Sequence, residues 1–352
     1  MSILSAGGAW TALVTPFTRT GAFDVRAYAR LLEFQRDQGI NGVVPCGTTG
    51  ESPTLSWEEH GAAVAAAVRM MEGHAGVLAG AGSNNTAEAI DGTRDAWSRG
   101  ASGVLLVDCY YNGPSSLELR TEYYQRVLDA VPDVQIVPYV IPGRTGCSLG
   151  SADLAILHQQ APDRVPAVKS ATGDLEIMRR DRELAGPSLT VFSGDDELTM
   201  GMMRDPGILA AGGISVISNL APAAMQEMCA AQRSGDTARA ETLNRALTPL
   251  CELVGCKVQA TRVLPNGMHV QVDDRFRNPG PVKTMMAGLG MVEPVVRAPL
   301  GLMSAPAVAL CRAALQKVHR ESAFVLEPIE AAFGVSIAQR LSDDAIWSAL
   351  AR

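Results

Sequence analysis

Short runs of apolar residues, rich in Val, Ile and Leu, recur along the first two thirds of the chain. Between these runs the apolar positions follow helical spacing, for example over residues 24–38, 56–71, 86–99 and 117–131. Successive runs begin roughly 25 to 35 residues apart, which is the length of one strand–helix unit. The runs that we expect to form strands begin at Thr11, Gly42, Val77, Gly103, Gln135, Val165, Thr190 and Gly213.

Eight strand–helix units predict an α/β fold, a (β/α)8 TIM barrel. The runs are nearly continuous in apolar residues, as in parallel strands that are covered on both faces. An open doubly wound sheet has the same alternation, but no G-x-G-x-x-G motif follows the first run and eight units favour closure. We therefore expect a barrel over residues 1–222 and a C-terminal helical region over residues 223–352.

A β-hairpin insertion is predicted near residues 257–273, inside the C-terminal region. The alternating runs VQATRV and MHVQV flank the sequence LPNG there, and Asn-Gly between such runs is a strong hairpin signal. The sequence leaves open whether this hairpin packs on a neighbouring subunit or overhangs the rim of the barrel. Residues 322–352 are expected to add further helices.

Composition and charge exclude several classes of partner. The net charge is -7 and 19% of the residues are charged, so the summed field repels phosphate backbones and anionic membranes. The seven cysteines are scattered and odd in number, which favours reduced thiols. No leader pattern begins the sequence and no apolar run is long enough to span a bilayer. These features predict a soluble, cytoplasmic protein without nucleic-acid or membrane partners.

The stretch VPAVKSATGD places a single cation, Lys169, inside a run that otherwise resembles a buried strand. Burial of an ammonium group lowers its pKa, and a neutral amine is a nucleophile that suits Schiff-base chemistry. The alternative is a lysine at the end of a strand, whose stem lies on apolar surface while its head reaches water. Other polar side chains follow neighbouring strands at the carboxyl rim, where barrel enzymes place their active sites: Thr48, Thr49, Tyr110, Tyr111 and Tyr139.

These motifs together resemble the dihydrodipicolinate synthase and N-acetylneuraminate lyase family of class I, lysine-dependent aldolases. The resemblance covers roughly residues 8 to 320, and its combination of motifs is specific. It is carried by VTPF (14–17), GTTGES (47–52), YYN (110–112), YVIPGRTG (139–146), VKSATG (168–173), SGDDELT and NPGPVK (278–283).

The resemblance implies roles for individual residues. Lys169 would form the Schiff base with the ketone of pyruvate or of another 2-keto acid. Tyr139 would be the acid and base, and Thr48 would relay protons between it and Tyr111, which relatives often supply from a neighbouring subunit. The substrate-binding residues would be Thr49 and Gly47 for the pyruvate carboxylate, the main chain at Ile214, and Arg144 for the carboxylate of an aldehyde.

Arg144 favours the dihydrodipicolinate synthase branch, because sialic-acid and keto-deoxy-sugar relatives usually lack this arginine. The resemblance then implies condensation of pyruvate with aspartate semialdehyde to 4-hydroxy-tetrahydrodipicolinate, in lysine biosynthesis. It also implies a homo-oligomer, a dimer or tetramer, and no cofactor beyond the covalent Schiff base on Lys169. The acidic doublets Asp195-Asp196, Asp273-Asp274 and Asp343-Asp344 fit helix starts and turns, and we expect no metal.

Several positions depart from the family pattern and keep two alternatives open. Ser170 stands where synthases commonly have Glu, and Asp108-Cys109 stands where Thr-Pro is usual. One alternative is a different Schiff-base aldolase, lyase or dehydratase that acts on a 2-keto-3-deoxy acid. The other is a ligand-binding barrel without turnover.

Regulated members of the branch bind lysine as an inhibitor, and five positions resemble their allosteric site: Trp57, His60, Asn84, Glu88 and Tyr110. Pro53 departs from the small residue expected in that site. The first two residues also fit a simpler interpretation, a helix start with Ser56 as N-cap and Glu59 completing a capping box.

Overall fold

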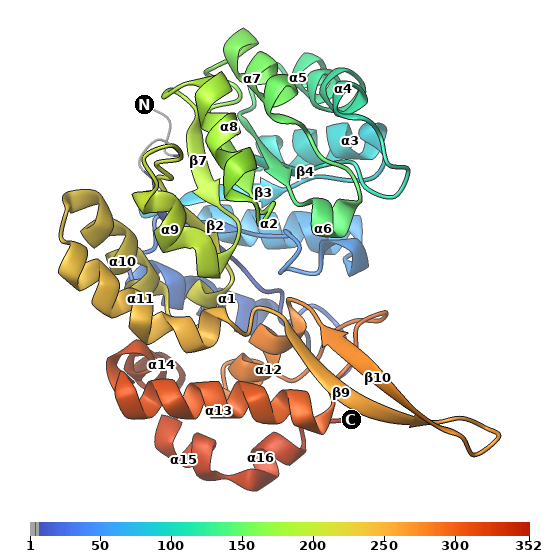
Figure 1. Ribbon diagram of the computed structural model, residues 1–352, viewed down its shortest axis with the longest axis vertical. Coiled ribbons are helices and arrows are strands. Elements are labelled where there is room, and N and C mark those ends of the chain that lie inside the picture. Colours follow the sequence, from blue (N-terminus) through green and yellow to red (C-terminus); the bar gives the residue numbers. More distant parts are fainter. Residues whose placement is uncertain (1–3, 5–6) are drawn as a thin grey trace.

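The computed structural model describes residue 4 and residues 7–352. Eight parallel strands form a closed barrel in which each strand pairs with the next and β8 pairs with β1 (Figure 1). The strands are β1 (Gly8–Ala12), β2 (Gly42–Val44), β3 (Gly76–Gly80), β4 (Gly103–Val107), β5 (Ile136–Val140), β6 (Ala167–Ser170), β7 (Thr190–Ser193) and β8 (Gly212–Ser215). The predicted TIM barrel is confirmed.

The first strand begins earlier than predicted. The sequence pattern placed its start at Thr11, whereas the paired residues already begin at Gly8, opposite Gly212 of β8. Gly8 and Ala9 carry too little apolar surface to give a strand signal. Beyond the strand, the backbone N–H of Val14 donates to the side chain of Asn219. The apolar residues that follow Ala12 therefore belong to the rim of the barrel.

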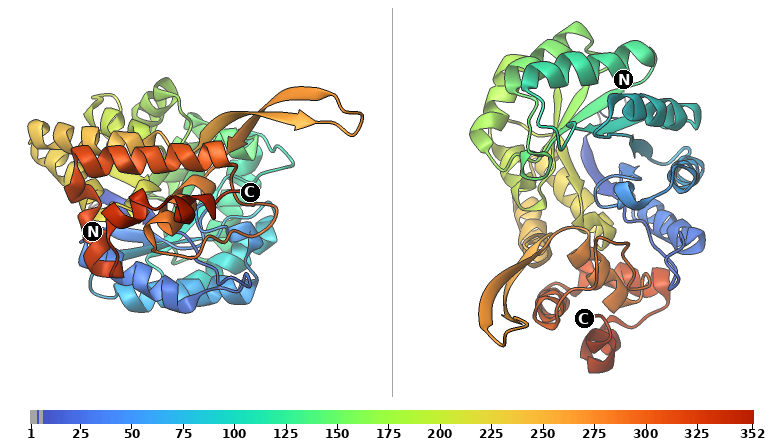
Figure 2. Two further views of the ribbon diagram at one scale, coloured as in Figure 1. Left: turned by 90° about the horizontal axis from the view of Figure 1, so that it is seen from below. Right: turned by 90° about the vertical axis from the view of Figure 1, so that its right-hand side faces the viewer.

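Helices alternate with the strands and surround them (Figures 1 and 2). Local capping sets their starts: the Asp24 side chain accepts from the first turn of α1, and Ser56 and Glu59 form the predicted capping box of α2. The helix expected over residues 117–131 contains a π-helical turn over Leu119–Tyr124. The helices are α1 (Val25–Asp37), α2 (Trp57–Met71), α3 (Thr86–Ser98), α4 (Ser116–Glu118), α5 (Gln125–Ala130), α6 (Pro142–Thr145), α7 (Ser151–Gln160), α8 (Leu175–Ala185), α9 (Thr199–Arg204) and α10 (Pro222–Ser234).

Large apolar side chains fill the inside of the barrel, separately from the core between strands and helices. Trp10 and Phe192 meet edge to face with ring centroids 6.2 Å apart. Gly42 lies against the Trp10 ring, where a Cβ atom would come within 2.2 Å of a ring carbon. The interior is thus a packed core, as in other barrels, and substrates must bind at its rim.

The C-terminal region adds a layer of helices and a hairpin beside the barrel (Figure 1). Strands β9 (Cys256–Val263) and β10 (His269–Phe276) form a two-stranded antiparallel sheet that projects from the body (Figures 1 and 2). This confirms the hairpin predicted near residues 257–273. The helices are α11 (Thr237–Cys251), α12 (Gly280–Leu289), α13 (Ala305–Glu321), α14 (Glu327–Phe333), α15 (Ile337–Ser342) and α16 (Asp344–Ser348).

The division of the chain near residue 222 stays a prediction. Within the described residues, every helix is too short or too polar to cross a bilayer.

Candidate active site

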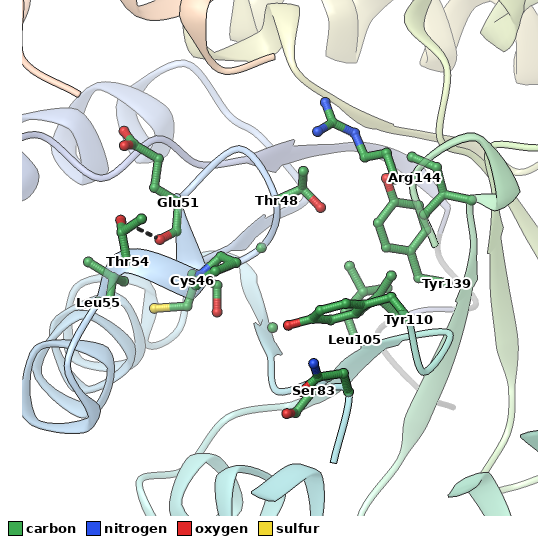
Figure 3. Close-up of a pocket in the computed structure, with 18 of the residues that line it drawn as sticks. Cys46, Thr48, Glu51, Thr54, Leu55, Ser83, Leu105, Tyr110, Tyr139 and Arg144 are labelled. Carbon is green, nitrogen blue, oxygen red and sulfur yellow. Dashed lines mark hydrogen bonds between the residues drawn. The ribbon is translucent and has the colours of Figure 1, made fainter. Parts of the chain in front are cut away.

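A cavity of about 530 Å³ opens at the carboxyl ends of the barrel strands (Figure 3). Its walls come from the loops after β2, β3, β4 and β5 and from the segment that follows β10. Four residues that the sequence predicted for the site line this cavity: Gly47, Thr48, Tyr139 and Arg144. The structure therefore brings together residues from the ends of four consecutive strands, β2 to β5, and a distant segment.

Lys169 on β6 is buried, with 5% of its surface exposed. Its Nζ atom lies 4.0 Å from the centroid of the Tyr139 ring, which forms part of the cavity wall. Within the described part of the chain, no carboxylate comes within ion-pair distance of this amine. Burial lowers the pKa of Lys169 to about 8, although the charges of Asp195 and Asp196 oppose the shift. Near neutral pH the amine is therefore neutral far more often than that of an exposed lysine.

Tyr139 is held on β5, directly beside Lys169 in the register of the two strands. Burial raises the pKa of its phenol, while Arg144 and a polar contact with Thr48 act in the opposite direction. The phenol consequently stays protonated at neutral pH and can donate a proton. Figure 3 shows Thr48 beside this ring and the Arg144 side chain near its hydroxyl end. This arrangement suits proton transfer to and from a group bound at Lys169.

Asn278 links the two predicted carboxylate-binding residues. Its side-chain Nδ2 donates to Thr49 Oγ1 at 2.8 Å, and its carbonyl oxygen accepts from Arg144 Nη2 at 2.9 Å. Thr49 is buried and does not itself line the cavity. Sequence reasoning noted the NPGPVK motif that contains Asn278 but assigned no role to this side chain, because only the fold brings residues 49, 144 and 278 together.

Lys169, Ile214 and Tyr111 are also absent from the cavity walls. Ile214 on β8 is buried inside the barrel, in the same apolar cluster as Tyr139. Tyr111 is 88% exposed and does not line the cavity of its own chain. The backbone φ of Tyr111 is 81°, which is uncommon for a residue other than glycine and marks this loop as a strained segment.

The five residues predicted for a lysine site are divided by the structure. Trp57, Asn84, Glu88 and Tyr110 line the same cavity as Tyr139. His60 does not line it, because its ring is buried and its Nε2 atom lies 2.8 Å from the Gly80 carbonyl oxygen.

A buried carboxyl group that sequence reasoning noted only as a departure holds two rim segments together. Asp108, at the end of β4, accepts from the Tyr124 hydroxyl at 2.6 Å and from the Leu149 backbone N–H at 3.0 Å. Burial raises the pKa of Asp108 to about 7. Ser170, the other departure, buries its hydroxyl without a hydrogen-bond partner in the described residues.

No metal site is found in the residues that the structure describes, since no three His, Cys, Asp or Glu side chains gather around a common point. The amine of Lys169, the phenol of Tyr139 and the guanidinium group of Arg144 are the groups that imine formation and acid–base catalysis require.

Comparisons with known proteins agree with this geometry. The profile of the Dihydrodipicolinate synthetase family matches residues 5–318. The chain is 40% identical over 293 residues to a 4-hydroxy-tetrahydrodipicolinate synthase of Nitratidesulfovibrio vulgaris strain DP4, covering 83% of this chain and 91% of the relative.

Solved structures of the family superpose on the barrel. The dihydrodipicolinate synthase of Aquifex aeolicus is 35% identical with a TM-score of 0.77, over 88% of this chain and 97% of that chain. The dihydrodipicolinate synthase of Acinetobacter baumannii, solved in complex with pyruvate, is 32% identical with a TM-score of 0.78, over 89% and 99%. The chain described here thus belongs to the dihydrodipicolinate synthetase family.

Proposed function

We propose that this protein is a 4-hydroxy-tetrahydrodipicolinate synthase, a class I lyase that condenses pyruvate with aspartate semialdehyde through a Schiff base on Lys169. The observation that carries the proposal is the buried Lys169 amine, which has a lowered pKa and lies against Tyr139. The names of the relatives and the pyruvate complex of a family member support the two substrates.

The reaction follows from the groups around Lys169. The neutral amine attacks the ketone of pyruvate, and Tyr139 protonates the departing hydroxyl group, so that one water leaves and an imine forms. The protonated imine withdraws electrons, so C3 of the bound pyruvate loses a proton and the resulting enamine attacks the aldehyde carbon. The amino group of aspartate semialdehyde then attacks the imine carbon, which closes the ring and releases Lys169.

Arg144 is the residue that we assign to the carboxylate of the aldehyde substrate. Its guanidinium group lines the cavity, and its only protein hydrogen bond in the described residues is to the Asn278 carbonyl oxygen. Remaining donors can therefore bind a carboxylate in a forked geometry. On the pyruvate side, Thr49 and the Gly47 loop are assigned to the pyruvate carboxylate.

Turnover of several aldehydes tests the proposed substrate. Purified protein, pyruvate and aspartate semialdehyde are expected to give the cyclic product, and R144Q is expected to raise KM for the semialdehyde at least tenfold with pyruvate adduct formation retained. Turnover of a 2-keto-3-deoxy acid without any of the semialdehyde would instead support another aldolase or dehydratase. Pyruvate binding without turnover of any substrate would support a ligand-binding barrel.

Tyr111 is assigned to the active site of a neighbouring subunit in a homo-oligomer, because on its own chain it is exposed and outside the cavity. Mixed oligomers of K169A and Y111F test this assignment. Each variant alone is expected to be nearly inactive, and subunit exchange is expected to restore activity, because some sites then combine an intact lysine with an intact partner tyrosine. Activity that stays at the level of the separate variants would contradict the assignment.

Lysine inhibition is proposed at the part of the cavity formed by Trp57, Asn84, Glu88 and Tyr110. Glu88 lies within 2.7 Å of the Ser83 hydroxyl and offers a carboxylate to an ammonium group. An inhibition titration with millimolar lysine is expected to lower the rate, and E88Q is expected to weaken this inhibition. A flat titration of the wild-type protein would remove the proposal.

A further inference from the structure

The root of the β9–β10 hairpin lies at the mouth of the active-site cavity. The chain leaves β10 through Arg277 and reaches Asn278, which lines the cavity. Arg277 Nη1 donates to the carbonyl oxygen of Gly143 at 2.9 Å, one residue before the substrate-binding Arg144. Arg144 in turn donates to the Asn278 carbonyl oxygen. The chain that leaves the hairpin is thereby bonded at two points to the segment that carries the substrate-binding arginine.

The cations of the hairpin differ in whether an acidic partner neutralises them. Lys257 on β9 is paired with Asp273, with 2.6 Å between Nζ and Oδ2. Arg275 lies opposite Lys257 in the strand register and is exposed, as is Arg277. In the portion of the chain that the structure describes, neither arginine forms an ion pair with a carboxylate. The two guanidinium groups at the root therefore keep their full positive charge available.

Both arginines act on Arg144 through space. The pKa of Arg144 is lowered first by burial and then by the positive charges of Arg277 and Arg275. Arg277 is bonded to the residue before Arg144, and Arg275 precedes Arg277 by two positions at the end of β10. The three guanidinium groups repel one another, and a bound anion would relieve that repulsion. Over the whole chain the net charge is -7, so the field at long range repels an anionic substrate. The positive charges of these arginines offset that repulsion where a substrate enters the cavity.

We propose that Arg275 and Arg277 form an anion-capture site at the mouth of the cavity, which draws the carboxylates of both substrates towards Arg144 and Thr49. This inference rests on the function proposed above and adds two specificity residues from the hairpin insertion. Each arginine acts from outside the reacting centre, so its charge speeds capture of the substrate and leaves the chemical step unchanged. Such attraction is worth roughly two- to threefold per charge in water and is screened by salt.

Charge variants at the hairpin root test the proposal. The variants R275Q, R277Q, R275K and R275Q/R277Q are compared with the matched control K257Q/D273N, which removes a neighbouring ion pair without changing the net charge. The rate of borohydride trapping of pyruvate on Lys169 is measured against pyruvate concentration at several ionic strengths. Condensation with aspartate semialdehyde is measured separately for kcat and kcat/KM.

The double variant R275Q/R277Q is expected to lower the capture of pyruvate about four- to ninefold at low ionic strength and less than twofold at 0.5 M salt. R275K is expected to retain capture, because it keeps the charge, and the charge-neutral K257Q/D273N is expected to resemble the wild type. Unchanged kcat with a reduced kcat/KM separates capture from a folding or positioning defect. Equal losses in K257Q/D273N and R275Q, or a loss that salt does not diminish, would overturn the proposal.

The two measurements distinguish this proposal from the proposed function. If pyruvate capture depends on the arginines and on salt while aspartate semialdehyde is not turned over, the assigned aldehyde is wrong and the anion-capture site stands. If condensation proceeds normally and all variants capture pyruvate equally at every ionic strength, the synthase stands and the capture site is wrong. Absence of any pyruvate adduct in the wild-type protein would contradict both.

Discussion

Two lysines of this protein are buried almost equally, and their surroundings give them opposite roles. Lys169 exposes 5% of its surface and Lys283 exposes 2%. The Lys283 Nζ atom lies 2.6 Å from Glu51 Oε1 and 2.9 Å from the Thr15 carbonyl oxygen. Lys169 has no such partner in the described residues and faces the Tyr139 ring.

The two lysines differ in which nearby charges offset the cost of removing their ammonium groups from water. Burial lowers the pKa of both amines, but at Lys283 the adjacent Glu51 directly stabilises the charged form. At Lys169 only the more distant charges of Asp195 and Asp196 oppose burial. Burial alone thus does not make a lysine a nucleophile. A buried lysine becomes a nucleophile where no carboxylate bonds to its amine and where a proton donor from the wall of an open cavity lies beside it.

The largest expected effect is the loss of catalysis when Lys169 is removed. K169A cannot form the imine, so we expect kcat to fall at least about 10³-fold while the protein remains folded. Steady-state kinetics measure the loss, and circular dichroism with thermal unfolding checks the fold. Residual activity above a few per cent would indicate that another residue carries the chemistry.

Loss of the other lysine is expected to damage stability. K283M leaves the Glu51 carboxylate buried without its cation, which should cost about 3–5 kcal/mol of the free energy of unfolding. Urea unfolding measures the change, and E51Q/K283M serves as the matched control because it removes both charges. We expect the double variant to recover at least half of the loss. A cost below about 1 kcal/mol for K283M would show that the pair contributes little.

The lowered pKa of Lys169 predicts how its burial affects stability at different pH values. The folded protein releases this proton near pH 8, whereas the unfolded chain keeps it until about pH 10.5. The burial penalty is therefore complete below pH 8 and disappears as pH rises towards 10.5. K169M, which lacks the penalty, should gain about 3 kcal/mol over the wild type at pH 7 through this effect.

The difference between the two proteins isolates this group from others that titrate at alkaline pH. Urea unfolding of wild type and K169M at pH 7, 8.5 and 10 should give stabilities that converge as pH rises. A constant difference across this range would mean that the pKa of Lys169 is not lowered by folding.

The smallest expected effect concerns the charge that opposes the shift at Lys169. D195N removes a negative charge that raises the pKa of the amine, so this pKa should fall by up to about one unit. The acid limb of the pH profile of pyruvate adduct formation should move to lower pH by the same amount. R180Q, a change in a surface ion pair, is a control that should leave the profile in place. A shift to higher pH in D195N would contradict the electrostatic account.

Much of the fold could be predicted because it depends on local patterns. Apolar runs at regular spacing indicated the eight strands, and Asn266-Gly267 indicated the hairpin turn. The start of β1 escaped this reasoning because glycine and alanine leave no apolar signal, although they pair with β8. The π-helical turn within residues 119–124 also has no local signature in the sequence.

The candidate site was predictable only as far as motifs marked it. Lys169, Tyr139 and Thr48 could be placed on one rim because the first two end strands of the predicted barrel and Thr48 follows one. The contact of Asn278 with Thr49 and the pairing of Lys283 with Glu51 join residues more than 200 positions apart. Such contacts depend on where the C-terminal region packs, which no local pattern determines.

Borohydride reduction in the presence of pyruvate, followed by peptide mapping, tests the comparison of the two lysines most directly. The account predicts a reduced pyruvate adduct on Lys169 and none on Lys283, with a yield that rises as pH approaches 8. An adduct on Lys283, or no adduct on Lys169, would contradict the claim that the unpaired buried amine is the nucleophile.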